Sequence, residues 1–145
     1  MSGLWGLAMS ASAVATLMLD GWQDDLHIRA IAILFGLSAI VAYPAATIIA
    51  QFLTRRGRFE TRLAAQLLAL ASVTLGVTSL AYAFYYRSYF AMWHDTTLSI
   101  TWTYQLVFTV LGALYQFAVF GMRLYLPVGI PALLLFALWQ SSKPR

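Results

Sequence analysis

Long runs of apolar residues recur along the whole chain, and only short polar segments separate them. A bilayer core about 30 Å thick needs roughly 20 apolar residues in a helix, because each residue adds about 1.5 Å. Several runs approach this length within 145 residues, of which 61% are hydrophobic and 10% are charged. In soluble domains about a quarter of the residues are charged. The sequence therefore predicts an all-α, polytopic integral membrane protein.

We expect a single transmembrane domain that covers residues 1–145 and contains about five spans. The predicted spans are 3–19, 30–53, 63–86, 98–121 and 124–139. The last segment is the weakest, because as a helix it reaches only about 24 Å. Four spans with a re-entrant segment at 124–139 are the alternative, and hydropathy favours the fifth span.

Basic residues set the expected orientation. Segment 54–62 has a single acid, Glu60, and four arginines: Arg55, Arg56, Arg58 and Arg62. Cytoplasmic loops are enriched in Lys and Arg, so this loop and the N-terminus are predicted to be cytoplasmic. Counting spans from there places Arg123 at the cytoplasmic surface. The side of the C-terminus stays open, since five spans put Lys143 and Arg145 outside and their charge favours the inside.

A line of polar residues runs along one face of the fourth segment. At 100° per residue its members lie within about 80° of one another. They are Thr101, Gln105, Thr109, Gln116 and Arg123, and a shorter line on the second segment comprises Tyr43, Thr47 and Gln51. Polar groups are costly against lipid, so we expect the stripe to face another helix, a water-filled cavity or a partner protein.

Acidic residues and histidines gather in the two loops predicted to lie outside. The first loop contains Asp24, Asp25 and His27, and the second contains His94 and Asp95. Carboxylates and imidazoles bind zinc and other divalent metals. Their spacing matches no established metal motif, so solvated loops are the favoured interpretation and no metal site is predicted.

Three aromatic residues, Tyr104, Phe108 and Tyr115, lie near one line of the fourth segment. Such a line suits contact with a lipid, quinone or pigment, although helix packing is its commoner role, and no cofactor is predicted. The chain has no cysteine, which excludes thiolate sites. It also has no nucleophile with a matched base and no phosphate-binding loop, so we expect no enzymatic activity.

Two functional hypotheses remain. The net charge is +4, but the basic residues are scattered at segment ends, so nucleic acid is not an expected partner. The favoured hypothesis is a non-catalytic accessory or structural subunit that lies in the lipid bilayer and packs against larger membrane partners. The alternative is a small homo-oligomeric transporter or channel for a polar solute. The predicted spans contain no full charge, which favours the first hypothesis.

Overall fold

The chain is all-α in a computed structural model that describes residues 1–54 and 58–143. Arg55, Arg56 and Arg145 of the orientation argument lie outside the described residues. The elements in chain order are α1 (Ser2–Leu19), α2 (Asp25–Leu53), α3 (Phe59–Phe90), η1 (Ala91–Trp93), α4 (Ile100–Val119), η2 (Gly121–Tyr125) and α5 (Leu126–Ser141). The predicted helical fold class is confirmed.

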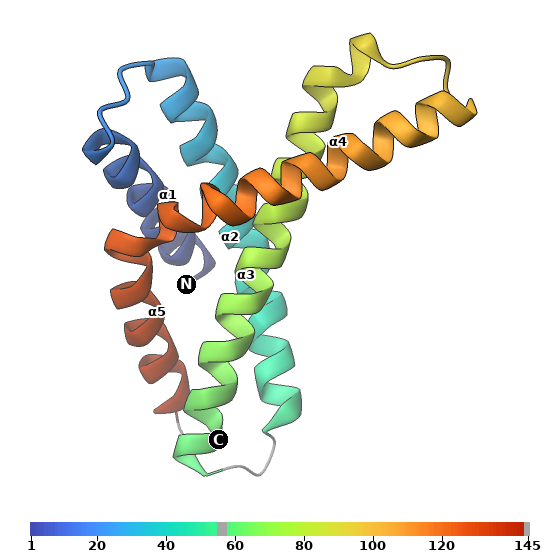
Figure 1. The fold of residues 1–145 in the computed structure, drawn as a ribbon. Coiled ribbons are helices and arrows are strands. Elements are labelled where there is room, and N and C mark those ends of the chain that lie inside the picture. The colour runs from blue at the N-terminus through green and yellow to red at the C-terminus, as the bar shows by residue number, and fades with distance from the viewer. Residues whose placement is uncertain (55–57, 144–145) are drawn as a thin grey trace.

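Helices α1, α2, α3 and α5 form the bundle, and α4 lies obliquely across it (Figure 1). Within the described residues, four helical stretches are long and apolar enough to cross a membrane. They are Ser2–Leu19, Asp25–Leu53, Phe59–Trp93 and Gly121–Ser141. The predicted span at 98–121 is not among them, whereas the doubtful segment 124–139 is. Four such helices support a membrane location, in agreement with the composition.

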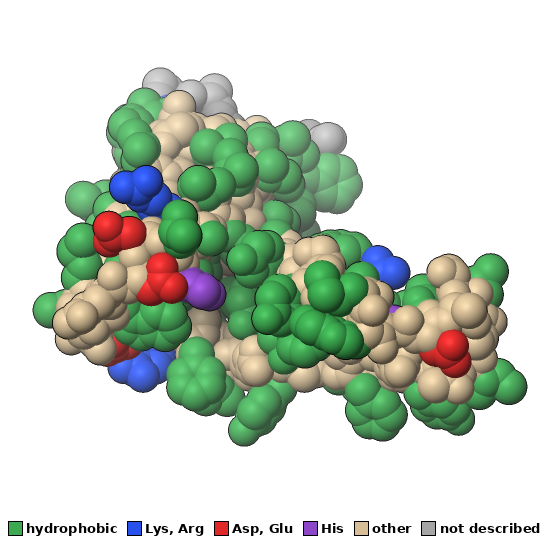
Figure 2. Space-filling view, turned by 90° about the horizontal axis from the view of Figure 1, so that it is seen from above, with side chains coloured by type: hydrophobic (Ala, Val, Ile, Leu, Met, Phe, Trp, Pro, Cys, Tyr) green, Lys and Arg blue, Asp and Glu red, His purple; other side chains and the backbone are tan. Residues whose placement is uncertain are grey.

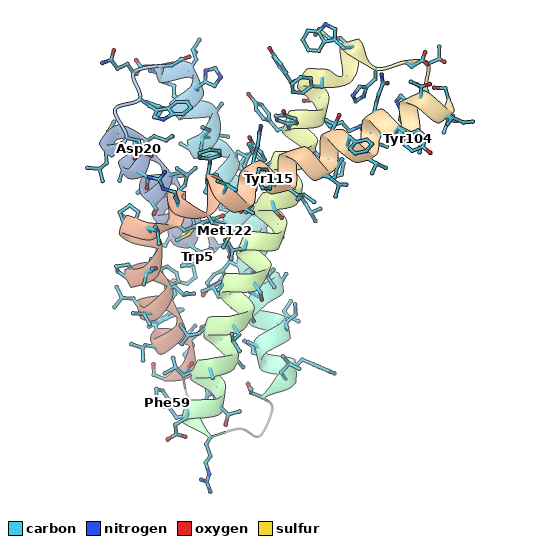
Figure 3. All side chains as sticks on the ribbon, in the orientation of Figure 1. Trp5, Asp20, Phe59, Tyr104, Tyr115 and Met122 are labelled. Atoms are coloured by element: carbon cyan, nitrogen blue, oxygen red, sulfur yellow. The ribbon has the colours of Figure 1, made fainter. Side chains whose placement is uncertain are left out.

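The two ends of the bundle are identified by contacts between distant residues. At one end, the Arg62 guanidinium donates a hydrogen bond of 2.8 Å to the carbonyl of Lys143. At the other end, Arg123 Nη2 lies 3.4 Å from Asp20 Oδ1. Figure 3 shows Met122, next to Arg123, towards the Asp20 end and far from Phe59.

The position of Arg123 differs from the sequence-based prediction, which put it at the same end as the arginine-rich loop. The reason is the path of α4, which crosses the bundle obliquely and does not run its length (Figure 1). The C-terminal part of the chain therefore returns through α5 to the end where α3 begins. The assignment of that end to the cytoplasm stays a prediction.

Small residues bring α1 and α2 close together. A Cβ atom on Gly6 would lie 2.8 Å from the carbonyl oxygen of Gly36, and one on Gly36 would overlap Ser10 Oγ. Ser10 also donates a hydrogen bond of 2.7 Å to the Ala32 carbonyl. Close backbone approach gives van der Waals contact, which must hold helices together where lipid supplies no hydrophobic drive.

Helix α5 begins against α1. The first N–H groups of a helix have no partner within it. Here Ser12 Oγ, buried on α1, accepts hydrogen bonds from the backbone N–H groups of Val128 (3.3 Å) and Gly129 (3.2 Å). The start of α5 is thereby fixed on α1.

Candidate functional site

The α3–α4 hairpin projects from the bundle as a separate feature, which we call the arm and define as residues 84–112 (Figure 1). It comprises the end of α3, η1, the connecting loop and the first part of α4. All its residues are described, and none of them is buried. The buried residues of α4, Ala113 and Phe117, come only after the arm ends.

The polar stripe of α4 meets the second loop inside the arm. Gln105 Oε1 accepts a hydrogen bond of 2.9 Å from the backbone N–H of Asp95. Thr109 Oγ1 lies 3.2 Å from His94 Nε2. The stripe and the His94–Asp95 pair, which the sequence presents as separate features, therefore form one hydrogen-bonded group.

The Thr109 hydroxyl sets the direction of its hydrogen bond with His94. A hydroxyl has one hydrogen, and Thr109 donates it to the Gln105 carbonyl at 2.6 Å. Its oxygen must then accept from His94, so Nε2 carries a hydrogen and donates. This nitrogen holds the loop on α4 and is not free to bind a metal.

The remaining stripe residues reach other elements. Gln116 Oε1 accepts a hydrogen bond of 3.1 Å from the Tyr82 hydroxyl on α3. Arg123 pairs with Asp20, and Thr101 is exposed. Four of the five residues thus contact other parts of the same chain: Gln116 contacts another helix, and the other three contact residues of the connecting segments. Its role as an interface or a pathway stays a prediction.

The shorter line on α2 lies elsewhere. Tyr43 and Thr47 are buried, whereas Gln51 is exposed. Thr47 donates a hydrogen bond of 2.9 Å to the carbonyl of Pro44 within its own helix. The Tyr43 ring packs edge-on against Phe136 of α5, with 5.9 Å between ring centroids. Tyr43 and Thr47 therefore belong to the bundle core, and none of the three residues lies in the arm.

The first loop forms a helix cap. Asp24 accepts hydrogen bonds from the backbone N–H groups of Leu26 and His27, and its Oδ2 lies 2.7 Å from His27 Nδ1. The side-chain and backbone hydrogen bonds from His27 lower the pKa of Asp24. Asp25 is exposed in the first turn of α2. Among the described residues, no group of three His, Asp or Glu is placed to hold a metal ion.

The aromatic line of α4 faces outwards. Tyr104, Phe108 and Tyr115 are 63%, 70% and 70% exposed, and Figure 3 shows Tyr104 and Tyr115 on α4. None of the three lines either of the two cavities described for the molecule. Contact with a lipid, quinone or pigment at these residues stays a prediction.

A cleft of about 400 Å³ lies where the α1–α2 end meets α3, α4 and η2. The Asp20–Arg123 and Tyr82–Gln116 pairs are among its lining residues. Sequence reasoning missed this site because its residues come from distant segments. The available signals in the sequence were Asp20, at the end of the first apolar run, and Arg123, between the last two apolar runs.

Comparisons with protein-family models, with curated proteins and with solved structures found no match. The functional argument therefore starts from the geometry of the arm and the cleft.

Proposed function

We propose that the protein is a non-catalytic accessory subunit that packs against a larger membrane protein through its arm. The observation that carries the proposal is the lack of any buried residue between Phe84 and Gly112. The arm nevertheless has many large apolar side chains that are exposed. They are Phe84, Tyr85, Tyr89, Met92, Trp93, Leu98, Ile100, Tyr104, Val107, Phe108 and Leu111.

The composition of the arm suits a protein partner. Aromatic residues and Met are enriched in the cores of interfaces, and acidic residues and Lys are depleted. The arm has one arginine, Arg87, and one acid, Asp95. Figure 2 shows hydrophobic side chains over much of the arm. The exposed threonines Thr101 and Thr103 lie on the same stretch, and this mixture fits another protein better than acyl chains.

A row of aromatic rings runs along α3 from the arm into the bundle, where it meets α4 and α2. The rings of Phe90 and Tyr86 have centroids 4.7 Å apart, and those of Tyr86 and Tyr82 are 6.1 Å apart. Tyr82 in turn contacts Phe117 at 6.1 Å, and Phe117 contacts Phe35 of α2 at 6.2 Å. Ring packing along α3 restricts the aromatic side chains of this part of the arm, so they lose less conformational entropy on binding, which favours affinity.

The test is extraction in mild detergent followed by native mass spectrometry. We expect the wild-type chain to emerge with larger membrane subunits, and the Tyr104→Ala, Phe108→Ala, Leu111→Ala triple variant, which changes three exposed residues of the arm, to emerge alone. The matched control is Leu37→Ala, Val41→Ala, Ile48→Ala, which removes three similarly exposed apolar side chains from α2. The control variant should keep the partner, since the proposal assigns docking to the arm.

A wild-type chain that emerges alone as a defined homo-oligomer contradicts this proposal and favours a small transporter or channel for a polar solute. One observation supports that second candidate. In the described part of the chain, the buried atoms Tyr43 Oη, Gln66 Nε2 and Ser141 Oγ have no hydrogen-bond partner. Such groups normally bond water. For a transporter, Gln66→Leu should reduce solute flux into proteoliposomes, and for an accessory subunit there is no flux to lose.

A further inference from the structure

The cleft between the α1–α2 end and the α4–η2 turn is amphipathic. Its volume of about 400 Å³ falls within the range of roughly 300–1,000 Å³ that is usual for small-molecule sites. Most of its wall is aliphatic or aromatic and comes from α1, α2, α4 and η2. Examples are Leu17, Ile31, Leu34, Phe117, Phe120 and Leu124. Such a wall suits an acyl chain.

Two opposite charges belong to the same cleft. Arg123 Nη2 and Asp20 Oδ1 are 3.4 Å apart, whereas hydrogen-bonded ion pairs are usually about 2.7–2.9 Å apart. Both side chains are partly exposed, at 56% for Arg123 and 39% for Asp20. The pair is therefore loose, and both charges remain accessible to a ligand that approaches from the cleft.

Aromatic residues with polar tips complete the lining. Trp22, Tyr82 and Tyr85 line the cleft together with the charged pair. Indole and phenol groups favour the headgroup level of a bilayer, because one part of the side chain is apolar and the other is polar. This composition matches the boundary between a lipid headgroup and its chains.

We propose that the cleft binds a phospholipid whose headgroup carries both a phosphate and a primary ammonium. The phosphate accepts hydrogen bonds from the Arg123 guanidinium, the ammonium donates to the Asp20 carboxylate, and an acyl chain lies along the apolar wall. A purely anionic headgroup would satisfy Arg123 but would be repelled by Asp20. Adjacent charges of opposite sign therefore select a zwitterion.

The experiment measures lipid binding to the full-length chain after delipidation in detergent, by native mass spectrometry. The probes are phosphatidylethanolamine, phosphatidylglycerol with the same chains, and inorganic phosphate. We expect phosphatidylethanolamine to bind about tenfold more tightly than phosphatidylglycerol, which is the worth of one charge-assisted hydrogen bond. Inorganic phosphate should not compete, since it lacks the chain and the ammonium.

Variants assign the binding to the cleft. Asp20→Asn should remove the preference between the two lipids, and Arg123→Gln should weaken both. Ala30→Trp places an indole in the cleft and should abolish binding, whereas Ala45→Trp is the same change on an exposed position of the same helix and should not. Circular dichroism checks that each variant is folded, and Asp20→Asn, at an exposed position, tests the proposal even if Ala30→Trp fails that check.

Four results would overturn the proposal. The first is equal binding of the two lipids by the wild type, and the second is an unchanged preference in Asp20→Asn. The third is full lipid binding by a folded Ala30→Trp variant, which would assign the lipid to the outer surface of the bundle. Competition by inorganic phosphate would show a free anion site at Arg123 in place of a lipid site.

Discussion

The guanidinium of Arg123 lies 3.4 Å from the carboxylate of Asp20, which is 103 residues earlier in the chain. Together with the hydrogen bond between Arg62 and the Lys143 carbonyl, this contact shows that η2–α5 begins near the end of α1 and ends near the start of α3. Helix α4 is left at the Asp20 end (Figure 1). This arrangement places the described C-terminal residues beside the start of α3.

Cysteine labelling tests this path directly, because the chain has no cysteine of its own. We expect single cysteines at Gln23 and Met122 to react with an impermeant maleimide from one side of sealed vesicles. Cysteines at Thr61 and Ser142 should react only from the other side. All four positions are exposed. Labelling at position 122 from the same side as position 61 would mean that α4 crosses the membrane. The side from which position 61 is labelled also tests the prediction that the loop 54–62 is cytoplasmic.

The close approach of α1 and α2 predicts that Gly36→Leu is destabilising. A side chain at this position overlaps Ser10 Oγ, so either Ser10 gives up its hydrogen bond to the Ala32 carbonyl or the two helices separate. We expect a loss of about 1–3 kcal/mol in the free energy of unfolding, as for other overpacked sites, measured by denaturation in mixed micelles. The control is Gly76→Leu, since no atom lies within 4 Å of a Cβ there. An equal loss in both variants would show that helix packing is not the cause.

The cap on α5 predicts that Ser12→Ala lowers stability. Two backbone N–H groups at Val128 and Gly129 lose their acceptor, and losing a capping side chain costs about 1 kcal/mol. Hydrogen exchange at these two amides should accelerate more than at the middle of α5. Ser72→Ala is the matched control, because Ser72 is exposed and donates to the Leu68 carbonyl of its own helix. Unchanged exchange in Ser12→Ala would argue against the cap.

The hydrogen bonds of Asp24 at the start of α2 predict that the stability of the protein depends on pH. Its hydrogen bonds with His27 and Leu26 lower its pKa in the folded protein, so its contribution to stability is present above the unfolded pKa. That contribution is lost as the pH falls through the lowered pKa. In thermal unfolding, the Tm of the wild type should therefore be higher than the Tm of Asp24→Asn near neutral pH. The two Tm values should converge in acid.

The control for this dependence is Asp25→Asn. Asp25 follows directly in the same turn, and within the described residues the structure gives it no side-chain hydrogen bond. A pH-dependent loss of the same size in Asp25→Asn would assign the effect to the general charge of the turn and not to the Asp24–His27 contact.

The helices were predictable from the sequence, because apolar content and length are local properties. Each predicted span overlaps one α-helix, and the polar stripe on α4 was visible from its spacing. The path of α4 was not predictable, since it depends on contacts such as Tyr82 with Gln116 and Phe35 with Phe117. Threonines and a glutamine near the start of α4 reduce its hydropathy, and this was the one local sign that the segment differs from the four candidate spans.

The cleft depends even more on tertiary structure. Its two charges occur at opposite ends of the sequence, and neither has a charged neighbour that suggests a pair. The aromatic line on α4 illustrates the same limit, because spacing showed that Tyr104 and Tyr115 share a face but not that the face points outwards.

The contact between Ser12 and the start of α5 also bears on the order of synthesis. Ser12 leaves the ribosome in the first helix, and its two partners follow 116 and 117 residues later. The hydrogen bonds between α1 and α5 at Ser12 can therefore form only after α5 has been synthesised. A chain halted before Val128 lacks both donors, so α1 can pair with α2 but cannot form this junction.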